Sequence, residues 1–237
     1  MKNDGHPSDR RAFLASGALL VGAHLVAPGP VFGAAPPQAE EEEEDVTPAE
    51  DLMREHGALN RILLIYDEAI SRMDAKKDFP PEVLASAASI VRRFVEEYHE
   101  KLEEDHLFPR FEKAGKLTDL VAVLKQQHAA GRNLTRTIEA NATLSSFRNA
   151  SQRGQLRKSL RLFVRMYRPH EAREDTILFP ALHTLIDPND YEELGDQFEG
   201  KERELFGQDG FEKIVAEIAA LEKKVGLYEL AQFTPPG

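Results

Sequence analysis

Histidine and glutamate recur in this chain in a pattern that is typical of metal ligands. The segment from His99 to Pro109 reads HEKLEEDHLFP, and the segment from His170 to Pro180 reads HEAREDTILFP. Each carries a glutamate four residues after its first histidine and ends in Leu-Phe-Pro. Residues four apart on a helix share one face, about 5–6 Å apart at Cβ. Each segment can therefore direct one imidazole and one carboxylate toward the same ion.

One further histidine precedes each segment, His56 before the first and His128 before the second. Leu52 and Leu124 lie four residues before these two histidines, so their settings also match. The matched positions indicate a repeat that fills residues 47–187. The candidate metal ligands from both copies are His56, His99, Glu103, His128, His170 and Glu174.

The chemistry of these side chains favours a pair of transition-metal ions. Imidazole and carboxylate donors without sulfur suit iron, manganese or zinc better than copper(I) or calcium. The chain has no cysteine, so thiolate sites and disulfides are excluded. A carboxylate can bridge two ions, and the duplicated motif favours two ions over one. A bridging oxide or hydroxide would then leave a few coordination positions open to small ligands.

Other polar residues near the motif are weaker candidates. Glu100 and Glu171 adjoin ligand histidines but lie about 100° round the helix, where we expect them to flank the site. His106 lies on nearly the same face as His99, but the second copy has Ile177 at that place. We therefore interpret His106 as a polar residue at the end of the core.

Aromatic residues and a proline also accompany the motif. Tyr167, one turn before His170, is expected to line the site or donate a hydrogen bond into it. Phe108 and Phe179 are expected to close the end of the helix bundle without touching a ligand. Pro169 lies inside its helix and should remove a backbone hydrogen bond and kink the helix there.

Four long amphipathic segments must position these residues. The pattern predicts helices from Pro48 to about Lys76 and from about Pro81 to Leu107. It predicts two more from Thr118 to about Ser146 and from about Gln152 to Leu178. Short connections between such helices favour an all-α, up-down-up-down antiparallel four-helix bundle.

The predicted ends of these helices follow from capping and breaking residues. Thr47 with Glu50 forms a capping box, and Pro48 suits the first helical position. Thr118 is the expected cap of the third helix, and residues 145–152 are expected to form a polar loop. The second and fourth helices should stop before the prolines of the two Leu-Phe-Pro segments, because proline cannot continue the helical hydrogen-bond ladder.

Residues 188–237 are expected to form a helical extension of the bundle. Helices are predicted from Asp190 to Phe206, with apolar Tyr191, Leu194, Phe198 and Leu205, and from Phe211 to Val225. The two should form a hairpin packed on the outside of the bundle, with a loose tail after it. The hairpin could also mediate dimerisation, so the sequence is compatible with either a monomer or a homodimer.

Charge and composition exclude some classes of protein. The net charge of −11 argues against a nucleic-acid partner. Six consecutive carboxylates, Glu40 to Asp45, are typical of a solvated linker, so residues 36–46 are predicted to join two parts of the chain.

Residues 1–35 are typical of an export signal. Ser8-Asp9-Arg10-Arg11 resembles the twin-arginine motif, although Asp9 interrupts its usual run. The apolar stretch from Ala12 to Val26 is short for a bilayer span, and small residues suited to signal peptidase follow it. We predict export through the twin-arginine pathway to the periplasm, with no stable membrane anchor after cleavage.

The ligand pattern resembles the haemerythrin-like HHE cation-binding proteins, and the resemblance covers residues 47–187. It implies a four-helix bundle with a non-haem di-iron centre that binds dioxygen. The oxygen carriers of that family have a second histidine where this chain has Arg132, and an aspartate ligand where it has Asp175. We prefer Glu174 as the ligand, because it shares a helix face with His170 and matches Glu103 in the repeat.

Three functions remain open from the sequence. The first is a di-iron protein that binds dioxygen or other small ligands for storage, scavenging or sensing. The second is an enzyme that uses the same centre on peroxide, nitric oxide or an organic substrate. The third is a helical module with one metal or none, which binds a partner protein. The pattern is more typical of a metal- and dioxygen-binding protein than of a dedicated enzyme.

Overall fold

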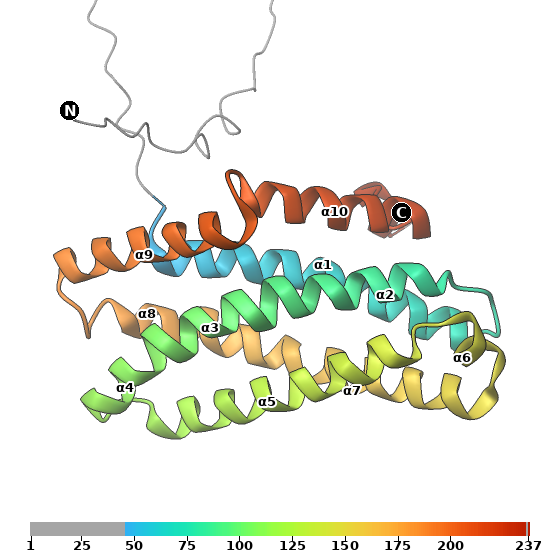
Figure 1. Cartoon of the computed structure of the whole chain (residues 1–237), viewed down its shortest axis with the longest axis horizontal. Coiled ribbons are helices and arrows are strands. Elements are labelled where there is room, and N and C mark those ends of the chain that lie inside the picture. Colours follow the sequence, from blue (N-terminus) through green and yellow to red (C-terminus); the bar gives the residue numbers. More distant parts are fainter. Residues whose placement is uncertain (1–45, 236) are drawn as a thin grey trace, which may run out of the picture. The chain divides into compact units, whose positions relative to one another are not determined.

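The computed structural model describes residues 46–235 and 237, and this part of the chain is helical without any β-strand (Figure 1). The predicted export signal and nearly all of the predicted linker lie outside the described residues. The helices are α1 (Pro48–Asp74), α2 (Pro81–Ile90), α3 (Glu100–Leu102), α4 (Phe108–Ala114), α5 (Thr118–Asn141), α6 (Leu144–Arg148), α7 (Ala150–Arg173), α8 (Phe179–Leu182), α9 (Pro188–Phe206) and α10 (Gly210–Val225).

The first helix begins as the sequence predicts. The Thr47 side chain accepts a hydrogen bond from the Glu50 amide at 3.3 Å, and the Thr47 amide donates to the Glu50 carboxylate at 3.0 Å. Both halves of the capping box are therefore present, with Pro48 at the start of α1. The predicted inward stripe of α1, which contains Leu52 and His56, is buried.

The prediction that the second and fourth helices end before the Leu-Phe-Pro prolines is wrong. Both helices continue through these prolines by widening into a π-helical turn, η3 (Glu103–Leu107) before α4 and η4 (Glu174–Leu178) before α8. A further π-helical stretch, η2 (Val91–His99), joins α2 to α3. A wider turn accommodates a residue that has no N–H to donate, and such turns are frequent at functional sites.

Two predictions about the second half of the repeat are also corrected. Thr118 is the first residue of α5, and the cap position is taken by Leu117 in the left-handed region at φ 52°. The predicted loop over residues 145–152 is mostly helical, because Thr143 caps the short helix α6. Asn149 then caps α7 by accepting hydrogen bonds from the amides of Ser151 and Gln152.

The long helices pack side by side around one apolar core (Figure 1). Helix α7 contacts α1 on one side and α5 on the other, and α2 with η2 contacts the remaining sides of α1 and α5. Four helical rods therefore enclose one interior, and they are formed by α1, by α2 to α4, by α5, and by α7 with α8. Their inward residues are apolar except for the histidines and carboxylates described below and a few hydroxyl groups, such as that of Thr135. Helix α7 runs through Pro169 without a break in its helical assignment.

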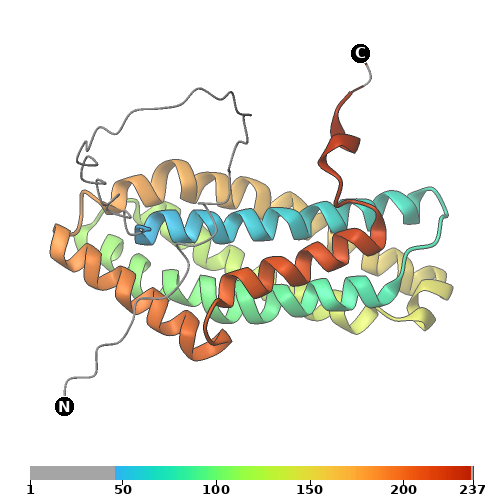
Figure 2. The same cartoon turned by 90° about the horizontal axis from the view of Figure 1, so that it is seen from above.

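Helices α9 and α10 pack against each other and on α1, and α10 also contacts α2. Figure 2 shows α10 lying along α1 and across α2, and both contacts are present in the structure. Tyr191, Leu194 and Phe198 are buried on α9, but Leu205 is 45% exposed and was wrongly assigned to the apolar face.

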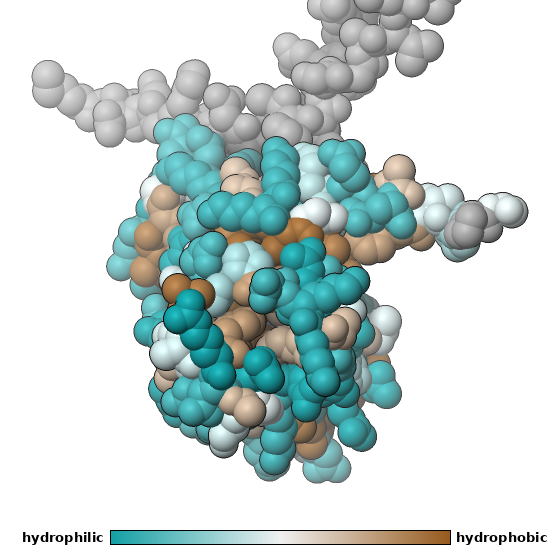
Figure 3. Space-filling model, turned by 90° about the vertical axis from the view of Figure 1, so that its right-hand side faces the viewer, coloured by the Kyte–Doolittle hydropathy of each residue, from teal (hydrophilic) through white to brown (hydrophobic). Residues whose placement is uncertain are grey.

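At the end of the molecule that Figure 3 faces, hydrophilic residues predominate and apolar ones lie scattered between them. Within residues 46–235, no helix combines the length and apolar character that crossing a bilayer would require.

Candidate metal centre

The six predicted ligands meet in the interior between the four rods, and every rod contributes at least one of them. His56 lies on α1, His128 on α5 and His170 on α7, while His99 ends η2. The two glutamates occupy the first positions of the π-helical turns η3 and η4. All six side chains are buried.

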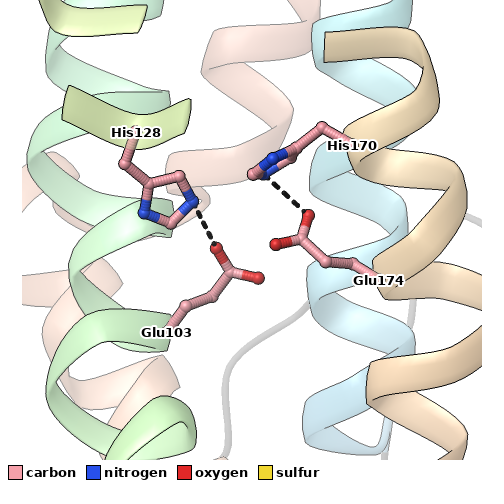
Figure 4. Close-up of side chains that lie close together, drawn as sticks. All are labelled: Glu103, His128, His170 and Glu174. Carbon is pink, nitrogen blue, oxygen red and sulfur yellow. Dashed lines mark ion pairs between the residues drawn. The ribbon is translucent and has the colours of Figure 1, made fainter. Parts of the chain in front are cut away.

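The two carboxylates lie between two pairs of imidazoles. Donor atoms of Glu103, His128, His170 and Glu174 all lie within 4.8 Å of one another, and so do those of His56, His99 and Glu103. Figure 4 shows the first group, in which the two histidines face the two carboxylates. Because Glu103 belongs to both groups, its carboxylate is placed to bridge two ions.

The Nε2 atom of each of the four clustered histidines points toward a carboxylate oxygen. His128 Nε2 lies 3.4 Å from Glu103 Oε2, and His99 Nε2 lies 3.7 Å from the same atom. His170 Nε2 lies 3.0 Å from Glu174 Oε2, and His56 Nε2 lies 3.4 Å from it. Each glutamate therefore joins one histidine of its own repeat and one of the other.

Polar atoms at the centre lack hydrogen-bond partners, which tests whether a cation fits there. Both carboxylate oxygens of Glu103 and of Glu174 are buried without a hydrogen bond, and so is His128 Nε2. Burying such groups without partners is costly, and buried charges are normally paired or bound to metal. Carboxylate oxygens and imidazole nitrogens are suitable ligands for iron, manganese or zinc, so the residues fit the predicted pair of ions.

The outer nitrogen of each histidine is held by a second residue. His99 Nδ1 lies 2.7 Å from Glu55 Oε2, and His170 Nδ1 lies 2.9 Å from Gln127 Oε1. Glu55 and Gln127 occupy the same place in the repeat, directly before the lone histidine of each copy. With Nδ1 carrying the proton that these oxygens accept, Nε2 is left with a lone pair for a metal.

The lone histidines are held by residues of the opposite repeat. His56 Nδ1 lies 2.7 Å from Asp175 Oδ1, and His128 Nδ1 lies 3.1 Å from Glu104 Oε1. Asp175 and Glu104 each follow a central glutamate in sequence. Asp175 therefore contacts the outer side of an imidazole, whereas Glu174 faces the centre.

The expectation that Phe108 and Phe179 stay away from the ligands is wrong. Phe108 stacks on His128 with ring centroids 5.5 Å apart, and Phe179 stacks on His56 at the same distance. Both phenylalanines are fully buried. Their rings therefore shield the two lone histidines from water and fix the plane of each imidazole.

Burial and charge shift the pKa values of the central groups. Burial lowers the pKa of His99 to about 4. Burial also opposes the charged form of His128, but contacts with Glu103 and Glu104 outweigh it and raise its pKa to about 10. Burial and the charge of Glu174 raise the pKa of Glu103. In the metal-free chain, protons therefore balance part of the carboxylate charge, and a cation would displace them.

Arg132 and Tyr167 form a partly buried network with carboxylates of the first copy of the motif. The Tyr167 hydroxyl donates to Glu100 Oε1 at 2.7 Å, and its ring lies 5.5 Å from that of His170. Arg132 lies 2.7 Å from both Glu100 and Glu104. Tyr167 thus fixes a flanking carboxylate, and Arg132 binds carboxylates next to the ligands.

The remaining candidates lie outside the cluster. Glu171 accepts a hydrogen bond from Asn60 on α1, which supports its interpretation as a flanking residue. His106 is partly buried against Phe198 of α9, with ring centroids 5.8 Å apart, and belongs to none of the ligand groups. Its interpretation as a polar residue at the edge of the core agrees with this position.

The acceptors of the histidine Nδ1 atoms were not predicted from the sequence, where Asp175 was considered only as an alternative metal ligand. One signal was available, because Glu55 and Gln127, and likewise Glu104 and Asp175, hold equivalent positions in the repeat. Polar residues at these positions also suit a solvent-facing helix surface, so the repeat alone does not single them out.

Comparison with known proteins agrees with the ligand pattern. Residues 47–182 match the family described as hemerythrin HHE cation binding domain. The chain is 45% identical over 200 residues to an uncharacterized protein of Mycobacterium bovis and to uncharacterized proteins of two Mycobacterium tuberculosis strains. These alignments cover 84% of this chain and 78% of each relative. No solved structure matches significantly.

Proposed function

Because the chain belongs to the hemerythrin HHE cation-binding domain family, we propose that its buried cluster holds two iron ions and binds dioxygen or a related small ligand. The proposed fold of the repeat is the up-down-up-down antiparallel four-helix bundle, with α9 and α10 as its extension. The short connections and the contacts among the four rods support this topology.

One observation carries the proposal: every histidine of the cluster presents Nε2 to a carboxylate while an oxygen acceptor holds its Nδ1. This is the arrangement by which proteins set the tautomer and direction of metal-binding imidazoles. A histidine kept only for packing does not require it, and here it occurs at His56, His99, His128 and His170.

The donor set supports iron among the possible ions. Four nitrogens and two carboxylates that reach both positions suit metals with more than four ligands, whereas structural zinc sites are almost always tetrahedral. A bound iron pair supplies redox chemistry and open positions for small ligands. The chain itself shields the centre from water, because the buried Phe108 and Phe179 rings stack on the two lone histidines, His128 and His56.

The test is the metal content of the purified chain and of two ligand variants. We expect about two iron ions per chain after anaerobic loading with ferrous iron. Glu103→Ala and Glu174→Ala should each lower the iron content sharply, because each removes a bridge. Glu112→Ala, on an exposed carboxylate of α4, is the control and should leave the content unchanged. Less than half an equivalent of any transition metal in the unmodified chain would refute the proposal.

A second candidate function, turnover of peroxide or nitric oxide, is favoured by Arg132. This residue forms ion pairs with Glu100 and Glu104, and its protonated guanidinium has no lone pair to offer a metal. The centre therefore has more open positions than it would with a histidine there. Such a centre should admit exogenous ligands readily and oxidise quickly in air.

Kinetics with small ligands separate the two candidates. Reversible dioxygen uptake without consumption supports a binding protein, whereas catalytic consumption of peroxide or nitric oxide supports an enzyme. Arg132→His should slow oxidation in air if the new imidazole reaches the metal. If Arg132→His keeps its iron and oxidises in air at the same rate as the unmodified chain, the arginine does not control the open positions.

A further inference from the structure

We propose that the two metal positions are unequal, and that the pair formed by His56 and His99 binds its ion more tightly than the pair formed by His128 and His170. The proposal rests on the proposed function, because it concerns the same centre. The two ligand pairs use the same residue types and both approach the central carboxylates. The difference lies in the groups that hold their Nδ1 atoms.

The clearest difference is between Glu55 and Gln127. His99 donates to a carboxylate at 2.7 Å, whereas His170 donates to a neutral amide at 2.9 Å. A carboxylate that accepts the Nδ1 proton makes the imidazole a stronger electron donor at Nε2. The amide orients its ring equally well but adds no negative charge, so His170 should be the weaker ligand.

The lone histidines differ in the same direction. Asp175 holds His56, and its side chain is partly exposed. Glu104 holds His128, but Lys101 lies 2.5 Å from Glu104 and Arg132 lies 2.7 Å from it. Two cations therefore offset part of the charge that Glu104 would otherwise contribute to His128.

Loss of such an outer carboxylate typically changes metal affinity about 10- to 100-fold. We therefore expect the first equivalent of a divalent ion to enter the His56 and His99 position. Two binding steps alone do not prove inequality, because a first ion repels a second one across the shared carboxylates. The question is decided by the position that the first ion occupies, and by whether that position changes when Glu55 and Gln127 are exchanged.

The experiment uses cobalt(II) and the full chain. Crystals grown with one equivalent of cobalt are measured by anomalous diffraction, which reports the occupancy of each position separately. The anomalous peak between His56 and His99 should exceed the other peak about tenfold or more. Calorimetric titration with cobalt(II) gives the corresponding affinities in solution.

Three variants test the cause. Glu55→Gln should weaken the first binding step, Gln127→Glu should tighten the second, and the double exchange should move the larger peak to His128 and His170. Gln126→Glu is the matched control, because it adds the same charge one residue away on an exposed position of α5. Circular dichroism confirms that each variant folds, and the gain expected for Gln127→Glu cannot arise from misfolding.

The inequality would be overturned if the two peaks were equal in the unmodified chain, or if the double exchange left their ratio unchanged. In either case, two bound ions per chain would still support the proposed function. A shift of equal size with Gln126→Glu would also overturn the inequality, since the effect would then be one of general charge. Failure to bind any cobalt or iron would instead refute the proposed function itself.

Discussion

Gly131 should be intolerant of even one added methyl group, because Tyr167 occupies the space beside it. A Cβ atom on residue 131 would lie 2.0 Å from the Tyr167 hydroxyl oxygen and 2.8 Å from its Cζ. Tyr167 cannot swing away easily, since it is 1% exposed and its ring lies 4.3 Å from that of Phe163. Gly131→Ala must therefore displace the tyrosine or separate α5 from α7.

The size of the effect follows from the contacts that would be lost. Overpacking a buried site costs about 1–3 kcal/mol, and leaving buried Glu100 without the Tyr167 hydroxyl costs about 1–3 kcal/mol more. Replacing a helical glycine with alanine returns about 1 kcal/mol through helix propensity. The net loss in the free energy of unfolding should be about 1–5 kcal/mol.

Urea denaturation of the metal-free chain measures this loss without interference from bound ions. Gly154→Ala is the control, because nothing lies within 4 Å of a Cβ there, and it should stabilise α7 by about 0.5–1 kcal/mol. Tyr167→Phe removes the hydroxyl that makes the closest contact. In that background, Gly131→Ala should cost at least about 1 kcal/mol less than in the unmodified chain.

The reasoning would be refuted if Gly131→Ala and Gly154→Ala had the same effect on stability. It would also be refuted if Gly131→Ala cost the same with tyrosine and with phenylalanine at residue 167. A further readout is the metal content of Gly131→Ala, because Tyr167 packs against His170. Displacement of the tyrosine should lower metal occupancy even where the protein remains folded.

Three other predictions follow from the centre and from the N-terminal sequence. Chelation should lower the melting temperature, because each ion present at about a hundred times its dissociation constant stabilises the fold by about 2.7 kcal/mol, or roughly 5–11 °C per ion in a domain of this size. Equal melting curves with and without chelator would contradict this. The metal-free chain should lose stability as pH rises from about 6.5 towards 10. The pKa of His128 is raised to about 10 in the folded state, so protonated His128 stabilises the fold, and this stabilisation is lost as the histidine loses its proton. Thermal melts that showed no decline in stability across this pH range would contradict the raised pKa. Replacing Arg10 and Arg11 with lysine should keep the chain in the cytoplasm, and cell fractionation that finds the same distribution as for the unmodified chain would refute export by the twin-arginine pathway.

The helices and the six central residues were predictable because both depend on spacing. Periodic apolar residues predict which helix face is buried, so Leu52 and Leu124 correctly placed His56 and His128 inside. The i to i+4 spacing likewise placed each glutamate on the same face as its histidine. These are local properties that one helix expresses by itself.

The errors arose where tertiary structure overrides a local rule. Proline stops an isolated helix, yet Pro109 and Pro180 are accommodated because a π-helical turn precedes each of them. Phe108 and Phe179 were expected at the bundle end, but the same wider turns precede them, and they stack on histidines of other helices. Neither the turn nor the contact has a signature in local spacing.

Contacts between the two repeats explain why the motif occurs twice in one chain. The first repeat supplies Glu103 and Glu104 to the two ring nitrogens of His128, and the second supplies Glu174 and Asp175 to those of His56. One repeat alone would leave its lone histidine without an inner carboxylate from the other copy, an outer acceptor or a stacking phenylalanine. The functional unit is therefore the pair of repeats, and each of these residues should be judged by its effect on the histidine of the opposite copy.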